Sequence, residues 1–171
     1  MKKKLIILTF ILFIVSCSKK KDTVAKKDFL EKIQELVLSE DKIGQEYLFR
    51  ILLENQFIEY KISYIGQIEN NQKGKIKFLF LTTFSGLNED SKRANSRLII
   101  YKSSNNDKIG YYYLGGIYKD SIEISDNTLI LPKSGENCNL TTEISFKDSI
   151  PDEIFINCTK SGGDFYKFER E

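Results

Sequence analysis

The side chains best suited to acid–base chemistry in this 171-residue chain are its carboxylates, because the sequence contains no histidine. Histidine is the most frequent general base and a frequent zinc ligand, so its absence excludes Ser-His and Cys-His nucleophile pairs and most zinc sites. Adjacent acidic residues occur at Glu89-Asp90 and at Asp152-Glu153. Two carboxylates that act as acid and base need different surroundings several ångströms apart, which neighbours on a polar turn do not provide. We therefore expect no catalytic site, no metal and no cofactor.

The first of three cysteines, Cys17, follows an apolar run that is too short to cross a membrane. Residues 2–4 are lysines, and in residues 5–15 only Thr9 is polar. About eleven residues in a helix span about 16 Å, which is well short of the roughly 30 Å hydrocarbon core of a bilayer. Such a length is typical of the apolar region of a secretory signal. The alternative is an uncleaved short helix with an incidental cysteine.

The four residues that end this run are Ile14, Val15, Ser16 and Cys17. They resemble the lipobox of bacterial lipoproteins, which consists of an aliphatic residue, a loosely specified residue, a small residue and a cysteine. The sequence departs from the commonest form at Ile14, where leucine is usual. The resemblance covers residues 1 to about 21 and says nothing about the remainder of the chain.

The resemblance implies that residues 1–16 are removed as a signal peptide and that Cys17 carries a diacylglycerol and an acylated amino group, with chains such as palmitate. Several acyl chains give lasting attachment to a membrane. Residues 17–27 would then form a flexible, lysine-rich tether. Ser18 stands where an aspartate would retain a lipoprotein at the inner membrane, so we expect the outer membrane of the cell envelope. Whether the protein faces the periplasm or the cell surface stays open.

The formal net charge of +2 belongs to the complete chain and is set by its N-terminal lysines. From Asp28 onward there are 18 basic and 23 acidic residues, a balance of −5. A nucleic-acid-binding domain would instead carry a basic stripe. We expect a membrane contact through the lipid on Cys17 and no nucleic-acid partner.

Residues 28–171 are long enough for one globular domain with a core of its own. Within them, apolar residues at Phe29, Ile33 and Val37 recur at helical spacing, which predicts an N-terminal helix. A second apolar pattern covers residues 43–54. It fits a second helix, but residues 47–53 also fit a buried strand, and the sequence does not decide between the two.

From Phe57 onward the apolar period changes to two. Ile58, Tyr60, Ile62 and Tyr64 alternate with polar residues, which predicts a strand. Further strands are expected at residues 75–84, 98–101, 109–118, 122–125, 128–131, 141–147, 153–159 and 165–169. Short strands without interleaved helices predict antiparallel connections. The expected fold is α+β and mainly β: a helix or helix pair packed on a curved antiparallel meander sheet, either barrel-like or a two-layer sandwich.

Cys138 and Cys158 remain once Cys17 is assigned to lipid. They are an even pair in an oxidising compartment, and pairing residues 144–146 with 154–156 brings them together. We predict a structural disulfide that closes a loop of about 21 residues and contributes roughly 3 kcal/mol. The alternative is two separate thiols.

The segment YYYLGGIY places Tyr111, Tyr112, Tyr113 and Tyr118 close together. Tyrosine is favoured at protein interfaces because it combines contact area with a polar tip, so these four are candidate partner-contact residues. The alternative is a strand that bends at its two glycines and half-buries its tyrosines. The polar loop of residues 85–96 is a further candidate contact loop, or a plain connection.

These observations favour a non-enzymatic binding module, anchored in the bacterial cell envelope, that holds an envelope protein or a small ligand. An inhibitor or immunity-like role is one form of this function. The alternative is a structural accessory subunit of an envelope assembly. A third candidate is a small hydrolase that uses carboxylates alone.

Overall fold

The computed structural model describes residues 28–53, 56–118, 121–133 and 138–171. Cys17, the expected signal peptide and the expected tether lie outside these residues. The chain divides into two compact units, Met1–Leu36 and Val37–Glu171, and the second unit contains all the strands that the structure describes. Among the described residues, no helix has both the length and the apolar character to cross a membrane.

The predicted N-terminal helix is confirmed over residues 28–40. In its last turn, Val37 and Leu38 are fully buried. The helix is followed by Asp41, which has a positive φ of 50° and therefore cannot continue a right-handed helix.

The prediction of a second helix is wrong, because β1 (Glu46–Leu53) is a strand. It pairs with β2 (Gln56–Asn70) along its whole length, from Glu46 opposite Ser63 to Leu53 opposite Gln56. The backbone pairing with β2 outweighs a helical pattern that spans only two turns. Residues 47–53 therefore form a strand, as the alternative predicted, but the strand is not buried, because Leu48 is 55% exposed.

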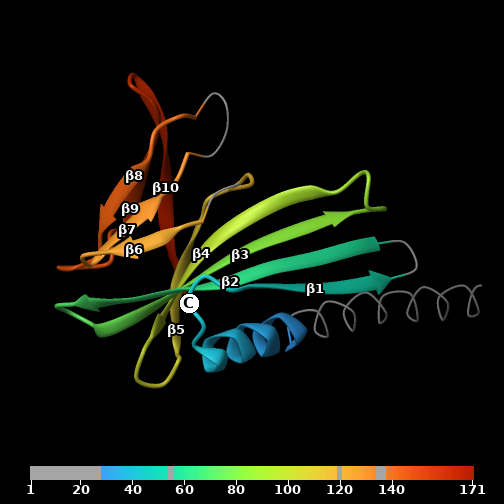
Figure 1. Ribbon diagram of the computed structural model, residues 1–171, viewed down its shortest axis with the longest axis horizontal. Coiled ribbons are helices and arrows are strands. Elements are labelled where there is room, and N and C mark those ends of the chain that lie inside the picture. The colour runs from blue at the N-terminus through green and yellow to red at the C-terminus, as the bar shows by residue number, and fades with distance from the viewer. Residues whose placement is uncertain (1–27, 54–55, 119–120, 134–137) are drawn as a thin grey trace, which may run out of the picture. The chain divides into compact units, whose positions relative to one another are not determined.

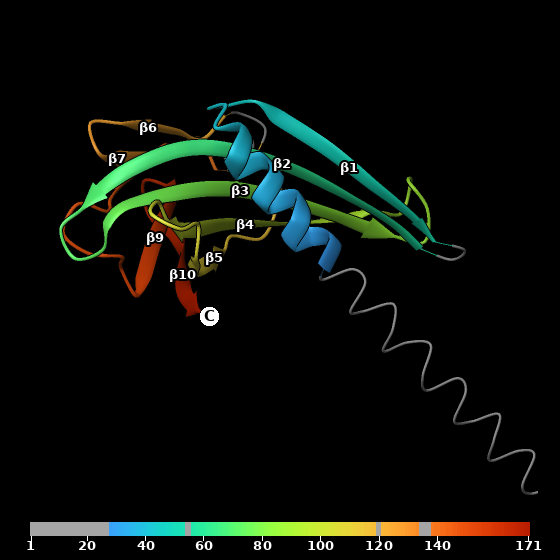
Figure 2. The ribbon, with the colours of Figure 1, turned by 90° about the horizontal axis from the view of Figure 1, so that it is seen from below.

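The strands form two antiparallel sheets, and the predicted mainly-β class is confirmed (Figure 1). The larger sheet has the order β1-β2-β3-β4-β5-β10-β9, and the smaller has the order β6-β7-β8. The long strands of the larger sheet are curved, as Figure 2 shows. Because β1 and β9 end the larger sheet, the described strands do not close a barrel. The remaining bounds are β3 Gly74–Gly86, β4 Arg93–Lys102, β5 Lys108–Tyr113, β6 Glu123–Ser125, β7 Thr128–Leu131, β8 Thr142–Ser145, β9 Glu153–Thr159 and β10 Gly162–Arg170.

One face of the larger sheet, here called the core face, packs in a single hydrophobic cluster with the smaller sheet. Phe146, just after β8, links the two sheets, because its ring centre lies 4.9 Å from that of Phe78 and 6.2 Å from that of Tyr112. The amide of Asn70 donates a 2.6 Å hydrogen bond to the Phe146 carbonyl. The cluster also contains Ile68, Ile76, Leu98, Ile100, Leu129, Leu131, Ile144, Ile154 and Ile156.

The opposite face of the larger sheet, here called the second face, is also apolar. A β-bulge between Tyr64 and Gly66 in β2 changes which residues of that strand lie on each face. Before the bulge, Ile62 lies opposite Leu81, and after it Ile68 lies opposite Ile76. Since side chains alternate along a strand, Ile62 and Tyr64 share the second face with Leu81, whereas Ile76 and Phe78 belong to the core face.

Candidate functional site

The predicted tyrosine cluster is divided between the two faces of the sheet. Tyr112 is 0% exposed, and its hydroxyl donates a hydrogen bond to the Pro151 carbonyl. Tyr118 is also buried, with its ring centre 5.6 Å from that of Phe80. Burial raises the pKa of both hydroxyls. Both tyrosines belong to the core: Tyr112 is fully enclosed and Tyr118 is only 8% exposed.

Tyr111 and Tyr113 lie on the second face of β5, beside β4. In the register of these strands Arg97 stands opposite Tyr113, and Ile99 stands opposite Tyr111. The Tyr111 hydroxyl donates to the Glu169 carboxylate, and the Tyr113 hydroxyl donates to the Asn95 side-chain oxygen. The hydrogen bond with Glu169 raises the pKa of Tyr111. Tyr113 is 41% exposed, so its ring is accessible while its hydroxyl is held.

The Arg97 guanidinium lies over both rings, 5.1 Å from the centre of Tyr111 and 5.8 Å from the centre of Tyr113. Attraction between a cation and the faces of aromatic rings holds the side chain in this position. We call the surface formed by Arg93, Asn95, Arg97, Tyr111 and Tyr113 the tyrosine–arginine face.

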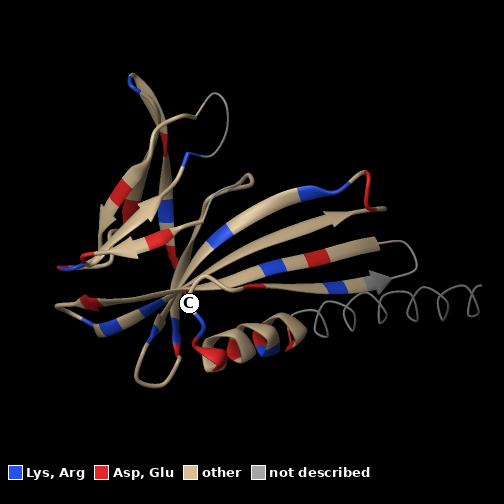
Figure 3. Ribbon diagram, in the orientation of Figure 1, with Lys and Arg blue, Asp and Glu red and all other residues tan. Residues whose placement is uncertain are grey.

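Neither arginine of this face has a carboxylate partner in the described part of the chain. The ion pairs formed there involve other residues. Figure 3 shows basic positions along β4 and no acidic position on that strand. The guanidinium groups of Arg93 and Arg97 therefore have hydrogen-bond donors that are not committed to a described carboxylate.

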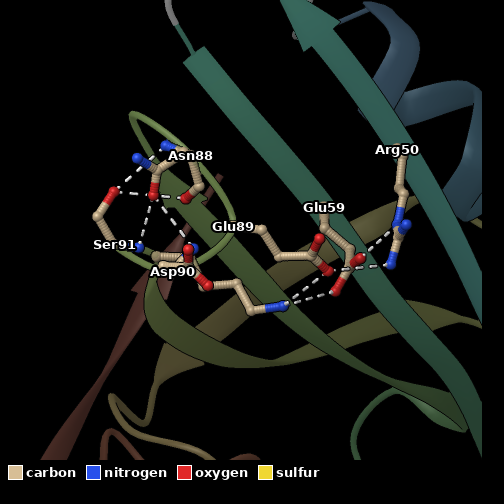
Figure 4. Close-up of polar contacts among 7 residues, drawn as sticks. Arg50, Glu59, Asn88, Glu89, Asp90 and Ser91 are labelled. Carbon is tan, nitrogen blue, oxygen red and sulfur yellow. Dashed lines mark hydrogen bonds and ion pairs between the residues drawn. The ribbon is translucent and has the colours of Figure 1, made fainter.

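A second group of charges lies where β1 and β2 meet the loop that precedes β4 (Figure 4). Glu59 accepts a 2.6 Å hydrogen bond from Arg50 Nε, and its other oxygen lies 3.7 Å from Lys92 Nζ. Glu89 completes a ring of four alternating charges, 3.6 Å from Arg50 and 3.9 Å from Lys92. We call these four residues the charge ring. Both cations also lie over the ring of Phe57.

Ion pairs join the four side chains of the charge ring. The Glu59 side chain is only 6% exposed and is held between two cations. The loop that carries Glu89 is closed by Asn88, whose side-chain oxygen accepts hydrogen bonds from the amides of Asp90 and Ser91. The predicted contact loop is therefore ordered by its own polar groups.

Sequence reasoning missed Glu59, which lies within an alternating strand and looked like an exposed residue. The signal that could have identified it is the register of the β1–β2 hairpin. Two residues separate Leu53 from Gln56, and this spacing places Arg50 directly opposite Glu59. The signal is readable only once β1 is known to be a strand.

The other adjacent acidic pair, Asp152-Glu153, lies beside basic residues of β10. Asp152 pairs with Arg170 at 2.6 Å, and Glu153 stands opposite Lys167 in the β9–β10 register. Within the described ranges, no group of three or more Cys, Asp or Glu side chains is arranged to hold a metal ion.

The predicted disulfide between Cys138 and Cys158 is confirmed. The Asn139 amide also donates a 2.9 Å hydrogen bond to the Cys158 carbonyl, so backbone and side chains hold the two segments together. The disulfide borders a hollow of about 280 Å³ that is also lined by Tyr113, Tyr118 and Tyr166.

No family model matches this chain, and its comparison with curated proteins and solved structures gives no significant match.

Proposed function

We propose that this protein is a lipid-anchored, non-enzymatic binding module of the bacterial cell envelope, and that it binds a partner protein through the tyrosine–arginine face. The observation that carries the proposal is the position of Arg97, whose guanidinium lies over Tyr111 and Tyr113 without a carboxylate partner among the described residues. Tyrosine and arginine are among the residues most enriched at the energetic centres of protein interfaces.

The face is also ordered before any partner arrives. Hydrogen bonds to Glu169 and Asn95 hold the two tyrosine rings, and the rings in turn hold Arg97. Side chains that are already ordered lose less conformational entropy on binding, which leaves more of the interaction energy as affinity. The same reasoning applies whether the partner is held transiently or as a permanent subunit of an envelope assembly.

Anchoring belongs to the proposal through Cys17. A lipid on this residue would hold the module at the membrane surface, most simply the outer membrane, and would present it to other envelope proteins.

The test is a crosslinked pull-down from intact membranes that compares the wild-type chain with Arg97→Ala and Tyr113→Ala. The matched control is Arg170→Ala, since Arg170 also lies over an aromatic ring, Phe168 at 5.7 Å, but is paired with Asp152. We expect the captured partner to be lost from both tyrosine–arginine variants and retained by the control. Equal capture by wild type and Arg97→Ala would exclude this face as the binding surface.

A further inference from the structure

Among the described strands, β1 forms one edge of the larger sheet and is paired on one side only (Figure 2). Its single partner strand in the described sheet is β2. At its centre, Leu48 is 55% exposed although it is a large apolar residue. An edge strand with exposed apolar side chains is a template for pairing with a further strand.

The direction of the β1 backbone groups follows from the contacts of β2. The Tyr64 carbonyl accepts a 2.8 Å hydrogen bond from the Gly44 amide, so at Tyr64 the β2 backbone is directed toward the β1 side. The direction of the backbone N–H and C=O groups alternates along a strand, so those of Ile62 and Tyr60 are also directed toward β1. The backbone groups of their partners Tyr47 and Phe49 are directed toward β2. The backbone groups of Glu46, Leu48 and Arg50 are therefore directed away from β2, at the open edge.

We propose that β1 of a second copy of this chain pairs with this edge in antiparallel register, with Leu48 opposite Leu48. The two strands are then related by a twofold axis, as in most homodimers. In this register Glu46 of each copy stands opposite Arg50 of the other, and the outward-directed backbone groups of both strands meet. The sheet becomes continuous across the dimer.

The charges of β1 select this register over its neighbours. Sliding the second copy by two residues either way places each charge opposite a leucine or Gly44. Sliding it by four residues places Glu46 opposite Glu46, or Arg50 opposite Arg50. Like charges directly opposite each other destabilise an antiparallel pair, and opposite charges stabilise it.

The charges within each copy support the same arrangement. Arg50 already lies 2.6 Å from Glu59 on β2 and 3.6 Å from Glu89, and the dimer would add Glu46 of the second copy as a further carboxylate beside it. Lys61 pairs with Glu46 on the same side of the sheet. Signs therefore alternate across the four strands that meet at the dimer axis. The tyrosine–arginine face lies on β4 and β5, so it stays free when β1 is paired.

The test uses cysteine substitution in the full-length chain, expressed in membranes and analysed on non-reducing gels. Residues in a hydrogen-bonded antiparallel pair have Cα atoms about 5.5 Å apart, which suits a disulfide. We expect Leu48→Cys to give a covalent homodimer. The control is Leu87→Cys, which is 79% exposed in the loop before β4 and is expected to stay monomeric.

The register has its own test. Chains carrying Glu46→Cys and chains carrying Arg50→Cys, with different affinity tags, should crosslink to each other and not to themselves. A second measurement on the unmodified edge is sedimentation of the detergent-solubilised chain, in which Leu48→Lys is expected to shift the dimer to monomer. The proposal is overturned by equal crosslinking of Leu48→Cys and Leu87→Cys, by a Leu48→Cys adduct with a different protein, or by self-crosslinking of the Glu46→Cys chain.

Discussion

Glu59 and Arg50 face each other on adjacent strands and form a 2.6 Å ion pair in which the acid is almost completely buried and the base is half exposed. The asymmetry determines what each substitution does. Removing Glu59 releases a cation that water can reach, whereas removing Arg50 leaves a buried carboxylate with Lys92 as its nearest cation.

We expect Arg50→Ala to lower the free energy of unfolding by about 2–3 kcal/mol and Glu59→Ala to lower it by about 1–2 kcal/mol, since an uncompensated buried charge costs more than an exposed one. Urea denaturation measures both values. Lys42→Ala is the control, because Lys42 and Glu40 form an exposed surface pair that contributes little. Equal effects of Arg50→Ala and Lys42→Ala would contradict the prediction.

Gly110 stands opposite Arg170 where β5 pairs with β10. A Cβ at this position would lie 2.3 Å from the Glu169 carbonyl oxygen and 2.6 Å from the Phe168 ring. Gly110→Ala is therefore expected to separate the two strands and to destabilise the protein by about 3 kcal/mol or more, in the range of overpacking and strain.

The matched substitution is Gly115→Ala, where a Cβ would meet no atom within 4 Å but φ is +61°. Its cost should be limited to the left-handed backbone, about 1–2 kcal/mol. Thermal unfolding of the two variants gives the comparison, and a smaller loss for Gly110→Ala than for Gly115→Ala would be the opposite of what the contacts require.

The disulfide connects segments that are 20 residues apart. Replacing both Cys138 and Cys158 with serine should lower the free energy of unfolding by about 3 kcal/mol, as expected for a loop of this length. The measurement is the urea midpoint of each protein with and without reductant. Reductant should lower the wild-type midpoint and leave the double variant unchanged; equal midpoints for the two oxidised proteins would show that the bond is not stabilising.

Tyr64 is buried on the second face, and burial, with a contribution from Asp41, raises the pKa of its hydroxyl to about 12. The folded protein therefore holds this proton more tightly than the unfolded chain, in which the pKa is 10.0. The stability from this group is complete below pH 10 and is lost as the pH rises toward 12. We expect the free energy of unfolding to fall over this interval, and to fall less steeply in Tyr64→Phe. If the free energy of unfolding fell equally with pH in the wild type and in Tyr64→Phe, the ionisation of Tyr64 would not be coupled to folding.

Cys17→Ala tests the anchor without altering any described residue. If Cys17 carries the proposed lipid, its loss should move the protein from the membrane fraction to the soluble fraction, because acyl chains are what would hold the chain at the membrane. Fractionation of cells followed by immunoblotting measures the change, and mass spectrometry of the wild-type chain should show the lipid on Cys17. Unchanged membrane retention of the variant would count against lipid attachment.

Much of the fold was readable from the sequence because it depends on local alternation. The period-two pattern from Ile58 to Tyr64 requires a strand, and polar turns divide the following segments into hairpins. The disulfide between Cys138 and Cys158 was predicted correctly. The pairing of residues 144–146 with 154–156 from which it was predicted is wrong, because β8 pairs with β7 and β9 pairs with β10.

The tertiary structure alone decided features that depend on which strand pairs with which. Residues 46–53 satisfy both a helical and an extended pattern, and only pairing with β2 selects the strand. That pairing buries Glu59 against Arg50, and the β4–β5 register brings Arg97 over Tyr111 and Tyr113 while Tyr112 turns into the core. Hydrogen bonds between strands join residues that are distant in the chain, and no local pattern of side chains carries that information.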